Sequence, residues 1–239
     1  MKRALVTGGS GDIGGAICRR LAADGLHVVV HGHRHPAQAA AVVADVATRG
    51  GSAEGVVFDL TDRARTAAAL SELLLAGPIQ ILVNNAGIHA DAVFPGMSDG
   101  QWDDVIAVGV HGFFNVTRPL ILPMIRTRWG RIVNISSLAA ITGNRGQVNY
   151  AAAKGALHAA SKSLALEVAS RGITVNVVAP GIIAGVMSAS AFDAKAIQSL
   201  VPMQRAGKPE EVADLVAFLV SEQAAYISGQ IISINGGMI

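Results

Sequence analysis

Residues 3–15 read Arg3-Ala-Leu-Val-Thr-Gly-Gly-Ser-Gly-Asp-Ile-Gly-Gly15, which is a short apolar strand followed by a glycine-rich turn. The apolar spacing that follows predicts an amphipathic helix from about Ile13 to Asp24. A strand, a glycine-rich turn and a helix form the context that a dinucleotide-binding fingerprint requires. Such a turn lets the backbone approach a pyrophosphate, and the helix N-terminus offers free N–H groups and a positive dipole end. We therefore expect a dinucleotide at this turn, in contact with Gly8, Ser10, Asp12, Ile13 and Gly14.

Strand-like and helix-like segments alternate along the rest of the chain. Short apolar runs predict further strands at 27–31, 52–58, 78–83, 131–137, 172–179 and 230–234. Helical spacing predicts helices at 37–49, 61–76 with Thr61 as the cap, 102–126 interrupted at Gly109 and Gly112, 149–170 and 209–220. Alternating strands and helices imply a parallel sheet with helices on both faces. The sequence therefore predicts an α/β fold, a Rossmann-type doubly wound parallel seven-stranded sheet in a single domain over 1–239. Its nucleotide-binding half is expected at about 1–90 and its catalytic and substrate half at about 91–239.

The composition excludes several classes of protein. Of the 239 residues 51% are hydrophobic and 15% are charged, which suits one well-buried core. The formal net charge of +2, from scattered Lys and Arg, argues against a nucleic-acid partner. The single cysteine, Cys18, excludes an internal disulfide and suits a reducing compartment. Because Cys18 has apolar neighbours on a predicted helix, we expect an inert, packed thiol.

Two apolar stretches raise the question of a membrane. Only a few apolar residues follow Met1-Lys-Arg before the glycine-rich turn, which is too short for a signal sequence. Residues 172–192 carry no charge, but Asn176, Pro180-Gly181 and Gly185 break that run. A strand followed by an active-site loop explains this uncharged run better than a membrane-spanning helix does. We therefore expect a soluble, cytoplasmic protein with no membrane partner.

The segment His31-Gly-His-Arg-His35 follows the second predicted strand, which ends without Asp or Glu. An acid at that point would accept hydrogen bonds from the ribose 2′-hydroxyl of NAD. A small cationic pocket would instead accept the 2′-phosphate of NADP, with contacts from His31, His33 and above all Arg34. The three alternating histidines could alternatively hold a metal ion, but no Cys or acid joins them, so we expect no metal.

Other predicted strands also end in residues suited to a dinucleotide, and the carboxyl ends of parallel strands gather at one edge of the sheet. Small residues after the strand 78–83 let a cofactor ring lie against the backbone, and the asparagines of Asn84-Asn85-Ala86-Gly87 can tie neighbouring strands, although a plain turn is the alternative. The mixture of apolar and small residues at 182–208 predicts a mobile lid. The expected contacts at these strand ends are Asp59 and Leu60 near the adenine, and Asn85, Ala86, Gly87, Pro180, Gly181 and Ile183.

Tyr150 and Lys154 stand four residues apart in an Ala-rich run that favours helix, so their side chains share one face. An ammonium beside a phenol favours the phenolate, and we expect Lys154 to lower the Tyr150 pKa from its usual value of about 10. That is the property of a general acid or base. Ser137 closes the strand 131–137, so its hydroxyl is expected at the sheet edge that binds ligands. A tyrosine and a lysine four residues apart are often only structural. Here the surrounding motifs favour catalysis by Ser137, Tyr150 and Lys154. Tyr150 and Lys154 are also expected to contact the cofactor.

Five motifs in this order resemble the short-chain dehydrogenase/reductase family over the whole chain: Thr7-Gly8-x-x-x-x-x-Gly14, Asn84-Asn85-Ala86-Gly87, Ser137, Tyr150-x-x-x-Lys154 and Pro180-Gly181. Within that family, Asn149-Tyr-Ala-Ala-Ala-Lys-Gly155 and the Asn-Gly-Gly-Met ending are similar to the 3-oxoacyl-acyl-carrier-protein reductases. The resemblance implies NADPH/NADP+ as cofactor and a 3-keto carbon as hydride acceptor. It also implies that Tyr150 protonates the alkoxide, Ser137 hydrogen-bonds the carbonyl oxygen and Lys154 holds the nicotinamide ribose.

The chain departs from the family pattern at four positions. Gly109 stands where the family has a catalytic asparagine, whose backbone carbonyl holds a water that feeds protons to the lysine. A glycine keeps that carbonyl in a looser helix. Asp12 replaces the middle glycine of the turn, and Gly11 replaces an arginine that often binds the 2′-phosphate. Gly185 replaces a threonine that commonly binds the nicotinamide amide, so the expected NADP preference depends on residues 31–35.

The resemblance also implies partners. It places an acidic acyl-carrier protein on Arg128 and Arg171, which are otherwise plain surface arginines. It implies a homotetramer that pairs the two long helices, about 102–126 and 149–170. Three alternatives stay open: a reductase or dehydrogenase of a free small ketone or secondary alcohol, a reductase that serves a specialised acyl pathway, and a non-catalytic NADPH-binding module.

Overall fold

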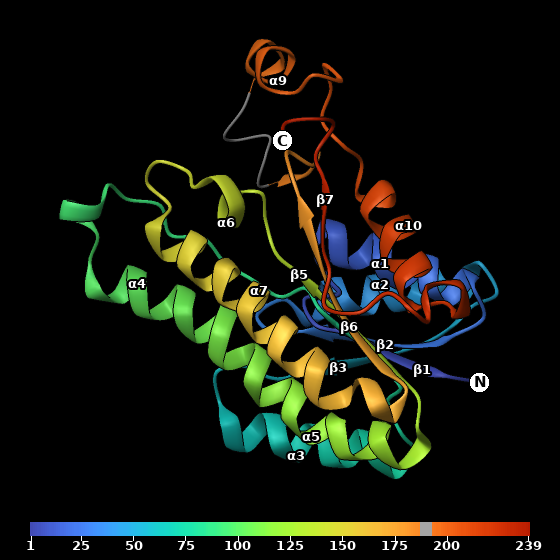
Figure 1. Ribbon diagram of the computed structural model, residues 1–239. Coiled ribbons are helices and arrows are strands. Elements are labelled where there is room, and N and C mark those ends of the chain that lie inside the picture. Colours follow the sequence, from blue (N-terminus) through green and yellow to red (C-terminus); the bar gives the residue numbers. More distant parts are fainter. Residues whose placement is uncertain (187–192) are drawn as a thin grey trace.

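A seven-stranded, all-parallel sheet forms the centre of the protein in the computed structural model, which describes residues 1–186 and 193–239 (Figure 1). Its strand order is β3-β2-β1-β4-β5-β6-β7, so the chain starts in the middle and winds outward in both directions. This arrangement confirms the predicted doubly wound sheet. The strands are β1 (Arg3–Val6), β2 (His27–Gly32), β3 (Ser52–Val57), β4 (Ile81–Asn84), β5 (Gly130–Ile135), β6 (Ile173–Pro180) and β7 (Ile231–Ile234).

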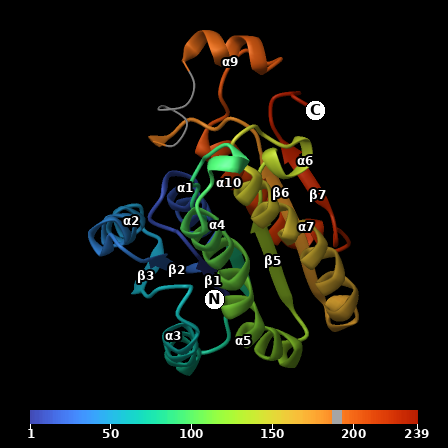
Figure 2. The ribbon, with the colours of Figure 1, turned by 90° about the vertical axis from the view of Figure 1, so that its left-hand side faces the viewer.

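Helices cover both faces of the sheet, as the two views of the ribbon show (Figures 1 and 2). The helices α1 (Asp12–Ala23), α2 (Pro36–Thr48) and α10 (Pro209–Val220) pack on one face, and α3 (Arg63–Leu75), α5 (Gly112–Thr127) and α7 (Val148–Val168) pack on the other. Strand residues alternate between the two cores, so that Ala4 and Val6 face the first and Leu5 faces the second. Cys18 is buried on α1, and burial raises its pKa to about 12, which fits the expected inert thiol.

The helix start at α3 corrects one prediction. Asp62, not Thr61, is the N-cap, because its side chain accepts a hydrogen bond from the N–H of Arg65 at 3.0 Å. Thr61 instead donates its hydroxyl to Asp59 at 2.8 Å. Asp and Thr are both good N-cap residues, so sequence alone did not distinguish two adjacent candidates.

The expected interruption of the long helix is confirmed as a π-helical turn. It joins α4 (Asp99–Ile106) through η2 (Ala107–His111) to α5. Gly109 is buried in this turn against α7, where a Cβ on it would lie 3.0 Å from the Cβ of Ala153. Among the described residues, Asp99–Thr127 is also the one stretch long and apolar enough to pass as a membrane span, a weak criterion that core helices of water-soluble proteins also meet.

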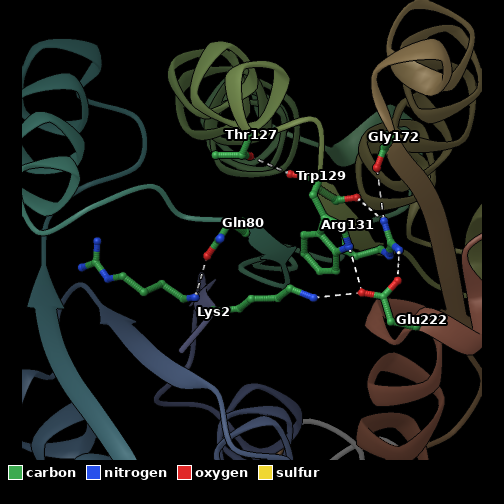
Figure 3. A network of polar contacts seen from close by, with 9 residues as sticks. Lys2, Gln80, Thr127, Trp129, Arg131, Gly172 and Glu222 are labelled. Atoms are coloured by element: carbon green, nitrogen blue, oxygen red, sulfur yellow. Dashed lines mark hydrogen bonds and ion pairs between the residues drawn. The ribbon is translucent and has the colours of Figure 1, made fainter.

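A polar network lies at the amino ends of β1 and β5, opposite the carboxyl ends of the strands that carry the motifs (Figure 3). Glu222 accepts hydrogen bonds from Lys2 at 2.9 Å, from the Trp129 indole at 3.0 Å and from Arg131 at 3.3 Å. The cations of Lys2 and Arg131 lie 3.8 and 4.3 Å from the Trp129 ring centre. This network joins the first residues of the chain to β5 and to η4 (Glu222–Ala224). It stabilises the amino ends of these strands without contacts from the motif residues.

The segment 182–208 is partly regular where it is described. Ile183 forms a parallel bridge with Gly207, and α9 (Ala194–Leu200) stands above the sheet edge (Figure 1). The predicted lid also covers 187–192, which lie outside the described residues, and its mobility stays a prediction. The remaining short elements are η1 (Phe94–Gly96), α6 (Ala139–Thr142) and η3 (Ala169–Arg171).

Candidate active site

Ser137, Tyr150 and Lys154 come together at the carboxyl end of β5. Ser137 follows the end of that strand by two residues, while Tyr150 and Lys154 lie in the first two turns of α7. The Ser137 hydroxyl lies beside the Tyr150 phenol and lowers its pKa, and the Lys154 ammonium lies 5.7 Å from the centre of the Tyr150 ring. The structure thus assembles the three residues that the sequence singled out.

The Lys154 ammonium is buried and hydrogen-bonds the carbonyl oxygen of Ile135 at 2.8 Å. Burial lowers its pKa to about 8, because the low-dielectric surroundings disfavour the charged form. Gly87 leaves room for this side chain, since a Cβ on Gly87 would lie 2.9 Å from Nζ. A neutral amine is therefore accessible at mildly alkaline pH.

Tyr150 corrects the expectation about its own ionisation. Burial raises the pKa of the phenol, the hydrogen bond from Ser137 lowers it, and the negative charge of Asp91 raises it further. The Lys154 ammonium hydrogen-bonds the Ile135 carbonyl and lies 5.7 Å from the centre of the Tyr150 ring. The net direction is upward, so the phenol keeps its proton near neutral pH.

Asn149 is a positioning residue that sequence reasoning missed. It is fully buried, and its amide donates to the carbonyl oxygens of Ala90 at 3.0 Å and Gln101 at 2.8 Å. Its side-chain oxygen accepts the N–H of Tyr150 at 2.8 Å. Asn149 thereby fixes the start of α7 to two segments that follow β4. The only signal in the sequence was an asparagine directly before the tyrosine.

Asn84 confirms that the asparagines tie neighbouring strands. Its amide donates to Asn134 on β5 at 2.8 Å and to Thr117 on α5 at 3.0 Å. Asn134 in turn donates to Ser161 on α7 at 2.7 Å. All four side chains are buried, so this network fixes β4, β5, α5 and α7 relative to one another beneath the catalytic residues.

The nucleotide turn is closed by backbone contacts that require its glycines. Gly14 touches the carbonyl of Gly8 so closely that a Cβ on Gly14 would lie 2.1 Å from that oxygen. Gly8 adopts a positive φ of 62°, which favours glycine. The Asn85 amide donates to the carbonyl oxygens of Thr7 at 3.0 Å and Gly8 at 3.1 Å. Thr7, which belongs to the predicted motif but not to the predicted cofactor contacts, accepts the N–H groups of Asn85 and Ala86 at its hydroxyl.

His31 does not belong to the predicted phosphate pocket. Its ring is buried, with Nδ1 accepting the N–H of Gly8 at 3.1 Å and Nε2 bonded to the carbonyl of Phe58 at 2.9 Å. Burial lowers the His31 pKa to about 4, so the ring is neutral near pH 7. The observed strand explains the error, because β2 extends to Gly32 and His31 therefore lies inside a sheet that is covered on both faces. His31 is a structural support of the nucleotide turn.

The exposed His33 and Arg34 and the half-buried Asp59 gather beside the nucleotide turn. The His33 ring lies 3.6 Å from an Asp59 carboxylate oxygen. Desolvation raises the Asp59 pKa, but hydrogen bonds from Thr61 and the charges of His33 and Arg34 outweigh it, so the net shift is downward. In residues 1–186 and 193–239, no group of three or more His, Cys, Asp or Glu side chains could hold a metal ion.

The loop after β6 lies against both β7 and the nucleotide turn. The N–H of Gly181 donates to Ile234 at 2.9 Å, and a Cβ on Gly181 would lie 2.9 Å from the Cα of Asn235. At the other end of the loop, a carboxylate oxygen of Asp12 accepts the N–H of Val186 at 2.8 Å. The structure thus brings together Asp12 and the 181–186 segment, two parts of the predicted cofactor site.

Arg128 and Arg171 lie away from the catalytic residues. Arg128 follows the last residue of α5, Arg171 ends η3 beyond α7, and the Arg128 guanidinium donates to the carbonyl of Ser170 at 3.2 Å. Tyr150 is near the other end of α7, whose 21 residues span about 30 Å. Within one chain, the two arginines therefore form a separate surface.

The assembled residues fit a nicotinamide dinucleotide. The turn 8–14 offers a cradle that a side chain on Gly14 would fill, and the N-terminus of α1 opens onto it. Ala86 and Gly87 are half-buried, and the missing side chain of Gly87 leaves room for the Lys154 ammonium. One feature works against a pyrophosphate: the carboxylate of Asp12, the first residue of α1.

Comparison with known proteins identifies a family and several relatives of this chain. Residues 2–196 match the family described as short chain dehydrogenase. The chain is 43% identical over 240 residues to a 3-oxoacyl-acyl-carrier-protein reductase FabG of Aggregatibacter actinomycetemcomitans, covering 98% of each chain. It is 44% identical over 241 residues to the protein of the same name from Aquifex aeolicus, covering 99% of this chain and 97% of the relative. An acetoacetyl-CoA reductase of Allochromatium vinosum is 41% identical over 245 residues, covering 98% and 97%.

Proposed function

The chain belongs to the short chain dehydrogenase family of oxidoreductases, and we propose that it reduces a 3-oxoacyl-acyl-carrier-protein to the 3-hydroxyacyl form with NADPH in fatty-acid or related acyl-chain biosynthesis. The observation that carries the proposal is the position of the Ser137 hydroxyl beside the Tyr150 phenol, with the buried ammonium of Lys154 next to them, at the sheet edge that also holds the nucleotide turn. A general acid and a hydrogen-bond donor can therefore act on the same carbonyl oxygen of the substrate.

Each catalytic residue has a defined task in this reaction. The Tyr150 phenol delivers its proton to the carbonyl oxygen, and its raised pKa keeps that proton available near neutral pH. The Ser137 hydroxyl hydrogen-bonds the same oxygen and orients it toward Tyr150. Lys154 supplies positive charge next to the phenol as the proton leaves. A bound nicotinamide cofactor supplies the hydride.

The preference for NADPH rests on the end of β2. The segment after this strand contains no acid, and the exposed His33 and Arg34 lie where the ribose phosphate is expected. Arg34 can bind a phosphate with two parallel hydrogen bonds. We assign Arg34 as the main 2′-phosphate ligand and leave His31 out of the set.

Gly109 is compatible with catalysis. Its position in the π-helical turn places its backbone close to Ala153, directly before Lys154. The carbonyl that the family resemblance assigns to proton supply is retained by a glycine. We propose that the carbonyl of Gly109 in this π-helical turn replaces the carbonyl of the family's catalytic asparagine. The enzyme would then keep its turnover.

The carrier-docking surface and the homotetramer form one proposal. Leu122 on α5 is 63% exposed and Leu166 on α7 is 86% exposed, an apolar face suited to a second copy. If two copies pair these helices antiparallel, Arg128 and Arg171 of one subunit approach the Tyr150 end of the other. An acidic carrier docked on one subunit would then deliver its acyl chain to the partner, in the cytoplasm.

A free coenzyme A thioester is the second candidate substrate, and the acetoacetyl-CoA reductase relative favours it. The two candidates share the 3-keto thioester and differ in what carries it.

The test is NADPH oxidation by the purified protein, with acetoacetyl-acyl-carrier-protein and acetoacetyl-CoA as alternative substrates and NADH as the alternative cofactor. We expect turnover with NADPH in preference to NADH and a higher kcat/KM for the carrier thioester. A higher kcat/KM for the coenzyme A ester would favour the second candidate. Tight NADPH binding without turnover on either thioester would refute the proposed reaction and leave a non-catalytic nucleotide-binding module or a reductase of a free small ketone.

A further inference from the structure

We propose that Asp12 is a positioning residue that holds the loop 182–186 against the nucleotide turn, and that Gly185 is small because the Asp12 side chain occupies the space beside it. The contact joins the first residue of α1 to the loop after β6, two segments far apart in sequence. For its effect on cofactor binding, the inference rests on the proposed NADPH site. The contact itself can be tested without any cofactor.

The hydrogen bond between Asp12 and Val186 is charge-assisted. A carboxylate oxygen of Asp12 accepts the Val186 N–H at 2.8 Å, while the Val186 residue is 80% exposed. Asp12 is the hydrogen-bond partner of this amide in an otherwise exposed residue. Bonds to an ionised acceptor are stronger than neutral ones. This bond is therefore the main restraint on that amide.

Gly185 and Asp12 fit each other sterically. A Cβ on Gly185 would lie 2.3 Å from the Asp12 carboxylate oxygen that accepts Val186, 3.0 Å from Cγ and 3.3 Å from Cβ. The closest of these atoms is the free end of a rotatable side chain. A side chain at 185 would therefore displace the Asp12 carboxylate while leaving the fold intact. The two departures from the family pattern at 12 and 185 thus occupy one volume and depend on each other.

The other end of the loop is held independently of Asp12. Gly207 donates its N–H to Ile182 at 2.9 Å and accepts the N–H of Ala184 at 2.8 Å. These two bonds form the bridge next to the start of α10. The loop is therefore fixed on one side by Gly207 and on the other by Asp12, and loss of Asp12 should release only the Val186 end.

The same carboxylate has a second, opposing effect on the cofactor. Asp12 stands at the helix end that favours an anion, so its charge opposes a pyrophosphate at that end. Asp12→Asn removes the charge and keeps an acceptor oxygen for Val186. Asp12→Gly removes both. The pair of variants therefore separates the loop contact from the charge.

Hydrogen exchange of the Val186 amide, without cofactor, measures the contact directly. Asp12→Gly should speed this exchange about tenfold, as expected for the loss of a charge-assisted hydrogen bond, and Asp12→Asn should restore most of the protection. The Ala184 amide is the internal reference and should not change. Asp99→Gly, which removes the acid from the first turn of α4, is the matched control and should leave Val186 unaffected.

The interdependence is tested by a double-mutant cycle with Gly185→Ala. In the native background Gly185→Ala should speed Val186 exchange about tenfold, and in the Asp12→Gly background it should add nothing. Gly100→Ala, at a helical glycine with open space around it, controls for the added methyl group. Independent, additive effects at 12 and 185, or unchanged exchange in Asp12→Gly, would overturn the proposal.

Cofactor binding gives the functional readout. By NADPH fluorescence, Asp12→Asn should bind about threefold tighter, since one like charge near the helix terminus is removed. Asp12→Gly should gain less than Asp12→Asn, because the loop is released. Equal gains in the two variants would show that the loop contact contributes nothing to the cofactor site. Absence of NADPH binding in every variant would refute the proposed function, while the exchange results would still decide the contact.

Discussion

His31 Nδ1 accepts a hydrogen bond from the N–H of Gly8 at 3.1 Å, so β2 supports the first glycine of the nucleotide turn from below. The other ring nitrogen is bonded to the carbonyl of Phe58 at 2.9 Å, and the two rings lie with their centres 4.4 Å apart. With Nδ1 as the acceptor, Nε2 carries the proton. This arrangement requires a neutral imidazole.

Acidification should destabilise the fold through His31. Burial lowers its folded-state pKa to about 4, below the unfolded value, so the unfolded chain binds the proton more readily between the two values. The stabilisation is complete above about pH 6.5 and decreases as the pH falls toward 4. The loss in the free energy of unfolding is about 2 kcal/mol at pH 5. Urea unfolding at pH 7 and pH 5 measures the difference.

His31→Asn is the matched variant, because it offers Gly8 an acceptor oxygen without a titrating ring. The stability difference between pH 7 and pH 5 should shrink by most of the 2 kcal/mol estimated above, about the contribution of one buried histidine. An unchanged pH dependence in this variant would show that other groups cause the loss.

Tyr150→Phe should abolish proton donation while leaving the nucleotide turn intact. The expected loss in kcat is about 10²- to 10⁴-fold, the range for one general acid. NADPH fluorescence titration should give a nearly unchanged Kd, because no contact that closes the turn involves the phenol. Turnover close to that of the native protein would refute the assignment of Tyr150.

The pH profile of kcat/KM should report Lys154. Its pKa is lowered to about 8 by burial, so the ammonium is lost above that pH, and the pKa of Tyr150 shifts in the opposite direction. We expect kcat/KM to fall as the pH rises through about 8, since this parameter follows the ionisation of the free enzyme. Lys154→Arg, which stays charged, should shift any fall to higher pH. A native profile that stays flat to pH 10 would contradict the role of the ammonium.

Gly14→Ala should damage the nucleotide turn. The new methyl group would lie 2.1 Å from the Gly8 carbonyl, which is backbone and cannot rotate away. Overpacking of this kind costs about 1–3 kcal/mol, measurable by urea unfolding, and NADPH affinity should fall with it. Gly11→Ala is the control, because its methyl group would meet the same oxygen at an ordinary 3.6 Å. Equal effects of the two substitutions would mean that the close approach is unimportant.

Charge reversal at Arg128 and Arg171 should act only on the carrier-bound substrate. The double change to Glu is expected to lower kcat/KM for acetoacetyl-acyl-carrier-protein about tenfold, mainly through association, with little change for acetoacetyl-CoA. Arg49→Glu, at the exposed arginine that caps the end of α2, controls for one charge reversal on a different surface and is compared with each single variant of the pair. An equal loss on both substrates would indicate damage to the fold or the oligomer and not to docking.

The sequence by itself determined the architecture and most of the site. The periodic alternation of strands and helices predicted the seven-stranded parallel sheet, and the Tyr150–Lys154 spacing predicted their common helix face, because both depend on local backbone geometry. Pro209 marked the start of α10 for the same reason, since proline is favoured in a first turn.

Tertiary structure decided where individual polar atoms point. His31 turned inward to Gly8, Lys154 turned to Ile135, and burial raised the Tyr150 pKa that a neighbouring charge was expected to lower. Asp12 met Val186 across 174 positions of sequence. These outcomes depend on dielectric surroundings and on contacts between distant segments, and neither residue type nor spacing along the chain records them.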